Sequence, residues 1–148
     1  MMTENSRAAD EARIREIIEE RVKAIRAKDV DTLMSAHAPD VVMFDALDPL
    51  RYVGSEAVRE RAGQWLSWYE GPVGYEVRDL SVTAGDEAAF CHYLYHVTGT
   101  MTNGREVDMW VRSTVCFRKV GGEWAVAHEH TSVPFDAESG KASVTLKP

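Results

Sequence analysis

The sequence predicts an α+β fold in which three N-terminal helices pack on a curved antiparallel sheet. Up to about residue 72 the apolar residues recur with a period near 3.6, which is typical of amphipathic helices. Beyond that point they alternate with a period of 2, as they do in strands. The connections between the strand-like segments are short, so neighbouring strands should run antiparallel. Helices followed by a series of strands are typical of the α+β class.

Three helical segments are expected, each with a start or stop signal. The first covers residues 11–28, and its apolar positions form one stripe: Ile14, Ile17, Ile18, Val22 and Ile25. The second covers residues 30–37, with Asp29 as its N-cap. The third is capped by Ser55 and stopped by residues 71–72, Gly-Pro.

Four strands are expected at residues 75–83, 87–99, 105–119 and 123–133, after an earlier β-prone run at 41–45. Asn103-Gly104 is the strongest turn signal, because a type I′ turn needs positive φ at both central positions. Three tight hairpins in a row predict a meander.

Length and charge limit the classes of function. The chain of 148 residues fits one domain, expected at 11–137 between a flexible N-terminus (1–10) and a C-terminal tail (138–148). A net charge of −7 argues against nucleic acid as a partner. No apolar run is long enough to cross a bilayer, and no signal peptide is visible. We therefore expect a cytoplasmic protein that does not bind membranes, with Cys91 and Cys116 reduced.

Two histidines near the C-terminal end are the first candidates for chemistry. In a strand at residues 123–133, Trp124, Val126, His128 and His130 would share one face. This face turns from apolar to polar along its length, as the wall of a pocket does. His128 could act as general base or acid, because the unperturbed pKa of histidine lies near neutrality.

Two carboxylates could complete such a site. Asp45 or Asp108 would orient His128 or share its proton, which makes His128, Asp45 and Asp108 the predicted catalytic residues. Alternatively, the H-x-H pair could supply two metal ligands, with His92 or His96 as a third. A third interpretation has the histidines hydrogen-bonding across a polar pocket without metal. We expect no metal and no cofactor.

The strand before the histidines adds candidate ligand contacts. Trp110 could form a flat apolar wall and Arg112 could anchor a carboxylate or carbonyl group. The competing interpretation is a core tryptophan and an arginine paired with an acidic neighbour. The expected substrate contacts are His130, Trp110, Arg112, His92 and Trp65.

The other sheet face should be apolar and should lie outside the cover of the helices. Its expected members are Cys91, Tyr93, Tyr95, Val97, Val111, Val115 and Phe117. Because exposed apolar faces mark association surfaces, we expect a homodimer through this sheet face.

Several of these segments resemble one protein family. The runs VDMWVRST (107–114), FRKVGGEW (117–124) and HEHTSVPFD (128–136), with GPVGYEVRDL (71–80), are similar to the SnoaL-like and ketosteroid-isomerase-homologue branch of the nuclear-transport-factor-2-like superfamily. The resemblance covers about residues 11–137. It implies a cone-shaped fold, a pocket between the helices and the concave sheet face, and a homodimer.

The resemblance also implies that ketosteroid isomerisation and polyketide cyclisation are among the reactions found in this superfamily. Ketosteroid isomerase uses a base Asp and an oxyanion hole of Tyr and protonated Asp. The first helix here contains no tyrosine, so a steroid isomerase is not expected.

Two functions remain open. The first is an isomerase, cyclase or dehydratase that acts next to a carbonyl group of a small apolar or carbonyl-containing molecule. The second is a non-catalytic ligand-binding or dimerisation domain.

Overall fold

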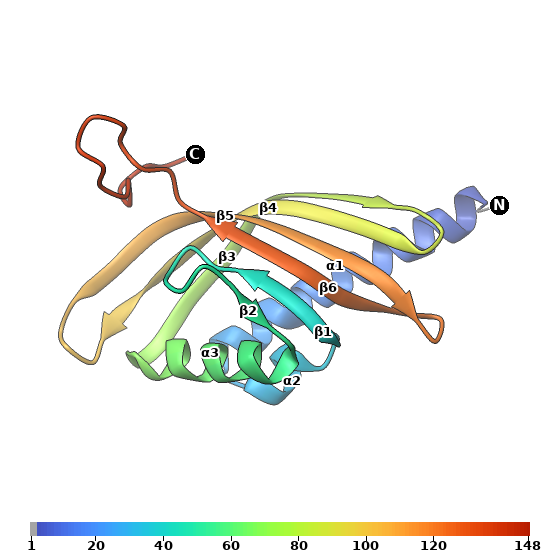
Figure 1. Ribbon diagram of the computed structural model, residues 1–148, viewed down its shortest axis with the longest axis horizontal. Coiled ribbons are helices and arrows are strands. Elements are labelled where there is room, and N and C mark those ends of the chain that lie inside the picture. Colours follow the sequence, from blue (N-terminus) through green and yellow to red (C-terminus); the bar gives the residue numbers. More distant parts are fainter. Residues whose placement is uncertain (1–2) are drawn as a thin grey trace.

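The computed structural model describes residues 3–148 and confirms the α+β class (Figure 1). Its elements are α1 (Glu4–Arg26), α2 (Val30–Met34), β1 (His37–Phe44), β2 (Tyr52–Val53), α3 (Ser55–Ser67), β3 (Tyr69–Ala84), β4 (Ala88–Met101), β5 (Glu106–Val120) and β6 (Glu123–Ser132). The helices lie against one face of a curved six-stranded sheet of order β2-β1-β6-β5-β4-β3. Within residues 3–148, none of the helices has the length and apolar character needed to span a membrane.

The first two helices are set by their capping residues. α1 begins at Glu4 rather than at residue 11, because the side chain of Thr3 caps it by accepting a hydrogen bond from the Ser6 N–H at 3.1 Å. α2 is capped by Asp29 as predicted, and it ends before residue 37 because β1 begins there.

The junction between α3 and β3 differs from the prediction. Gly54, with φ of 91°, occupies the N-cap position in place of Ser55. β3 starts at Tyr69, so Gly71 and Pro72 lie within the strand and do not separate helix from strand. β3 is an edge strand, where a missing N–H is tolerated.

The predicted meander of β3, β4, β5 and β6 is confirmed by antiparallel pairing between each strand and the next. Gly121 and Gly122 both have positive φ, so the paired positive values expected at Asn103-Gly104 occur at this turn instead. β1 then adds to the sheet parallel to β6, and β2 pairs with β1. This parallel pair brings the end of β1 beside the end of β6.

The core lies between the helices and the sheet, and it contains the residues expected on a bare face. Cys91, Tyr93, Val97, Val115 and Phe117 are all buried, in clusters that include the isoleucines of α1. The proposal that they form an association surface is therefore wrong, because the helices cover this face. Cys91 and Cys116 are both free thiols.

A β-bulge in β6 explains which residues face the core. Cys116 pairs with His128 while the next residue of β5, Phe117, pairs with Val126. Ala127 is thus an extra residue, and the alternation of faces shifts by one after it. Trp124 and Val126 point inward before the bulge, whereas Glu129 and Thr131 point inward after it. The predicted common face of Trp124, Val126, His128 and His130 is therefore wrong.

Candidate active site

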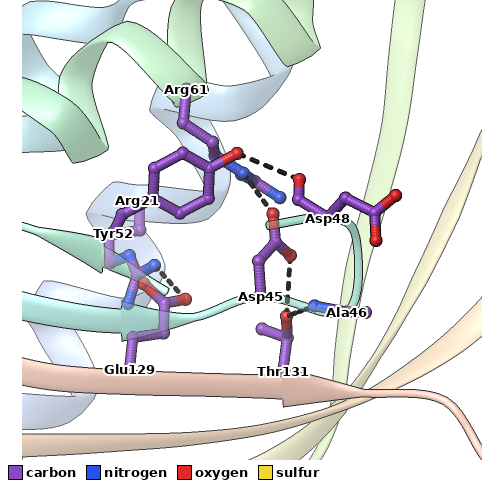
Figure 2. Close-up of polar contacts among 8 residues, drawn as sticks. All are labelled: Arg21, Asp45, Ala46, Asp48, Tyr52, Arg61, Glu129 and Thr131. Carbon is purple, nitrogen blue, oxygen red and sulfur yellow. Dashed lines mark hydrogen bonds and ion pairs between the residues drawn. The ribbon is translucent and has the colours of Figure 1, made fainter. Parts of the chain in front are cut away.

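A buried ion pair joins the first helix to the last strand. Arg21 extends from the inner face of α1, and its Nη2 donates to Oε1 of Glu129 at 2.7 Å (Figure 2). The two side chains are only 9% and 7% exposed. Burial alone would lower the pKa of Arg21 and raise that of Glu129, but their attraction reverses both shifts. Both groups are therefore charged at neutral pH.

A second ion pair lies where β1 ends. Nε of Arg61, on α3, donates to Oδ2 of Asp45 at 2.6 Å, and the Asp45 side chain is 2% exposed. The other oxygen of Asp45 accepts a hydrogen bond from Oγ1 of Thr131, which in turn accepts from the backbone N–H of Ala46 (Figure 2). Both oxygens of Asp45 are therefore engaged.

His37 stands at the start of β1 with its Nδ1 buried. No hydrogen-bond partner for this nitrogen occurs among residues 3–148. Burial, assisted by the positive charge of Arg21, lowers the pKa of His37 to about 4, against the smaller opposing effects of Glu129 and of the backbone of Met34 and Leu33 near the ring. Its imidazole is therefore neutral at pH 7 and able to accept a proton.

All of these groups except Asp45 and Ala46 line a cavity of about 40 Å³ between the helices and the sheet. Its polar lining includes Arg21, His37, Arg61, Glu129 and Thr131. Its apolar lining includes Ile25, Leu33, Met34, Met43, Val58 and Ala62.

Two tyrosines, Tyr75 and Tyr95, complete the wall on the β3 and β4 side. Their rings meet edge to face at 4.7 Å. Burial raises the pKa of both hydroxyls, so both keep their protons at neutral pH.

An outer pocket of about 150 Å³ adjoins this cavity through shared lining residues, Arg61 and Trp65. Asp45, Leu47 and Trp68 form part of its wall. The Arg61–Asp45 ion pair therefore lies between the inner cavity and the outer pocket.

Of the residues predicted to form a site, the structure brings Asp45 and Trp65 to this region. Trp65 lines both spaces, and the guanidinium of Arg61 lies over its ring at 5.6 Å. The remaining candidates lie on the outer face of the sheet.

His128 and His130 are on that outer face because of the bulge at residue 127. Nδ1 of His128 lies 2.7 Å from the carbonyl oxygen of Val42, and the ring of Phe44 packs against both imidazoles. His130 is exposed, and it also borders an open pocket formed by the loop after β1.

The other outer-face candidates form separate contacts. Asp108 pairs with Nε2 of His96 at 2.6 Å rather than with His128. Trp110 stacks on His96, with ring centres 4.7 Å apart. His92, an exposed residue, and Arg112, whose Nε donates to Ser132 at 3.0 Å, line neither the cavity nor the outer pocket. Within the described chain, no group of three His, Cys, Asp or Glu side chains is arranged to hold a metal ion.

The prediction from sequence missed Arg21, His37, Arg61 and Glu129. Arg21 had a visible signal, because it falls at helical spacing from Ile14, Ile17 and Ile25 on the buried stripe of α1. Glu129 had none, since strict alternation from Trp124 places it outside the core. The sequence could therefore have indicated a buried polar site through Arg21, a charged residue on an otherwise apolar helix stripe.

The comparisons with known proteins agree with this fold. A model of the SnoaL-like domain matches residues 14–136, which is most of the chain, so the protein belongs to the SnoaL-like domain family. Among curated proteins no match was found.

Solved structures extend the likeness. An NTF2-like protein of unknown function from Pseudomonas putida KT2440 is 34% identical, with a TM-score of 0.87, over 95% of this chain and 98% of that one. A proposed dehydratase of the NTF2-like family from Streptomyces avermitilis has 17% identity and a TM-score of 0.74, over 84% and 96%. A ketosteroid isomerase-like protein from Erwinia carotovora atroseptica has 20% identity and a TM-score of 0.71, over 83% and 95%. The last two, given their low identity, show a shared fold alone.

Proposed function

We propose that this protein is an acid–base enzyme that moves a proton next to a carbonyl group in the cavity under the sheet. The observation that carries the proposal is the imidazole of His37, which lines the same cavity as the guanidinium of Arg21 and whose buried Nδ1 has no hydrogen-bond partner within residues 3–148. Isomerisation, cyclisation and dehydration beside a carbonyl all begin with such a proton transfer.

In the proposed step, Nδ1 of His37 takes a proton from the carbon next to the carbonyl. The electrons of the broken C–H bond form a C=C bond, and the carbonyl electron pair moves onto oxygen. Charged N–H donors fixed beside that oxygen stabilise the developing enolate. A proton acceptor with a pKa of about 4 is adequate, since the catalytic Asp of ketosteroid isomerase has a pKa of about 4.6.

Asp45 has a different role in this proposal from the one predicted from sequence. Its two oxygens already accept hydrogen bonds from Arg61 and Thr131, which leaves it less available as a base than His37. We assign it to holding Arg61 at the boundary of the cavity. His128 and Asp108, on the outer face, take no part in this step.

The size of the cavity supports small substrates. About 40 Å³ is roughly a quarter of a cavity that holds benzene, ~150 Å³, so only the reacting end of a small substrate fits inside it and a polycyclic ligand does not. The rest of the substrate would lie in the adjoining pocket of about 150 Å³, which shares Arg61 and Trp65 with the cavity. Steroids are also disfavoured as substrates because α1 contains no tyrosine to donate a hydrogen bond to the substrate oxygen, as ketosteroid isomerase does.

A ligand-binding protein without turnover is the second candidate. It is favoured by the ion pairs, because both carboxylates near the cavity, Glu129 and Asp45, are held by arginines.

Exchange of carbon-bound hydrogen tests the proposal without knowledge of the natural substrate. Hydroxyacetone in D₂O would be followed by ¹H NMR, with buffer-catalysed exchange subtracted. We expect the protein to accelerate deuterium incorporation, His37→Gln to abolish the acceleration, and the matched outer-face variant His92→Gln to retain it. No acceleration by the wild-type protein, or equal rates for His37→Gln, would refute the proposal in favour of simple binding.

A further inference from the structure

The guanidinium of Arg21 has more hydrogen-bond donors than the protein uses. Only Nη2 is paired, with Glu129, while Nε and Nη1 are buried and have no partner within residues 3–148. The side chain is nine-tenths buried and lines the cavity. Because buried donors without acceptors carry a desolvation penalty, an acceptor on a ligand would be favoured here.

The charges around the cavity are already balanced. Arg21 is opposed by Glu129 and Arg61 by Asp45, and His37 is neutral at pH 7. A bound anion would add a negative charge that no further cation among the lining residues compensates, beside side chains that are less than a tenth exposed. An uncharged carbonyl oxygen would accept from the same donors without this cost.

Nδ1 of His37, which is buried without a partner within residues 3–148, adds a second requirement. In a neutral imidazole one nitrogen donates and the other accepts, and the proposed proton transfer requires the tautomer in which Nδ1 accepts, so Nδ1 can pair with a hydroxyl that donates to it. The two unmet groups therefore suit a ligand with a carbonyl and a hydroxyl, rather than one with a carbonyl alone.

We infer that the cavity receives the carbonyl and hydroxyl groups of small uncharged hydroxycarbonyl compounds, with Arg21 binding the carbonyl oxygen through Nε or Nη1 and His37 binding the hydroxyl. The remaining atoms of the ligand would extend into the adjoining pocket lined by Arg61 and Trp65. The inference rests on the proposed function for the location of the site, but it concerns binding and does not require turnover. It excludes 2-oxo acids of the same size as ligands, although a free arginine would ordinarily favour them.

Hydroxyacetone and pyruvate form a matched pair for the test, since both have three carbons and a ketone but only pyruvate is charged. Binding of each to the full chain at pH 7 would be measured by saturation-transfer NMR titration. We expect hydroxyacetone to bind at least tenfold more tightly than pyruvate. Tighter or equal binding of pyruvate would overturn the inference, as would no detectable binding of either compound, which would indicate a cavity filled by water.

Variants locate the binding site. Replacement of the ion pair by Arg21→Met with Glu129→Leu removes the donors without leaving a buried charge, and should weaken hydroxyacetone binding at least tenfold. Arg112→Gln, on the outer face, should leave it unchanged. Equal affinity in the double variant would overturn the role of Arg21. Selective binding of hydroxyacetone without hydrogen exchange would refute the proposed function while leaving this inference intact.

Discussion

The Arg21–Glu129 ion pair makes a sharp prediction about stability. Glu129→Gln keeps the shape of the side chain but leaves the guanidinium without its counter-charge in a place where both side chains are less than a tenth exposed. Removal of one partner of a buried pair costs about 3–5 kcal/mol. For a domain of this size, that corresponds to a fall in Tm of roughly 6–20 °C.

Urea denaturation followed by tryptophan fluorescence would measure the free energy of unfolding. Asp31→Asn is the matched control, because it breaks an ion pair with Arg59 whose side chains are 91% and 47% exposed. We expect a loss below about 1 kcal/mol there. The double variant Arg21→Met/Glu129→Leu should recover most of the stability lost in Glu129→Gln, since hydrophobic replacement of a buried pair is often neutral.

Two results would refute this reasoning. A loss below about 1 kcal/mol in Glu129→Gln would show that water reaches Arg21 and screens its charge. A double variant no more stable than Glu129→Gln would show that the cost does not come from the uncompensated cation. If Glu129→Gln does not fold at all, the stability of the double variant still decides between these explanations.

Three further predictions concern pH, the outer face and assembly. The unfolded chain protonates His37 near pH 6.5 but the folded chain only near pH 4, so stability should fall by about 3 kcal/mol as pH drops through that window; His37→Gln should remove this component in urea titrations, and an unchanged pH slope would contradict it. Glu129 makes a separate contribution, because its pKa is lowered in the folded chain: its share of the stability is lost only as the pH falls below its ordinary pKa of 4.5. His128→Gln and Asp108→Asn should leave hydrogen exchange on hydroxyacetone within about twofold of the wild type, and a larger loss in either would return the chemistry to the outer face. The homodimer was expected through the sheet face that the helices in fact cover, so a dimer through the sheet would have to use the opposite face, which carries Trp110. Trp110→Glu should then convert a dimer to a monomer in sedimentation velocity; a wild-type protein that sediments as a monomer would refute it.

The elements of the fold could be predicted because their signals are local. The isoleucine stripe of α1, the Asp29 cap and the glycine-rich connections each depend on a few neighbouring residues, and the structure has them where the sequence indicates. The parallel pairing of β1 with β6 could not be predicted in this way. It joins segments more than eighty residues apart, and it is this pairing that places Asp45 beside Thr131.

The site predicted from sequence was placed on the wrong face of β6 because the strand contains one extra residue. Strict alternation from Trp124 puts His128 and His130 on the inner face, and the extra residue Ala127 reverses this. A one-residue shift exchanges the two faces of a strand from that point onward. The sequence around residue 127 contains no glycine or proline that would mark a bulge.

The bulge and the buried arginine explain each other physically. Arg21 lies on the apolar stripe of α1, where an unpaired guanidinium would be prohibitively costly to bury. Without the extra residue in β6, the inner face would present His128 at this level, which is no counter-charge for a cation. With it, Glu129 reaches Arg21 and Thr131 reaches Asp45. The irregularity in the strand therefore supplies the carboxylate that Arg21 requires, and the same pair leaves Nε and Nη1 of Arg21 without an acceptor within residues 3–148.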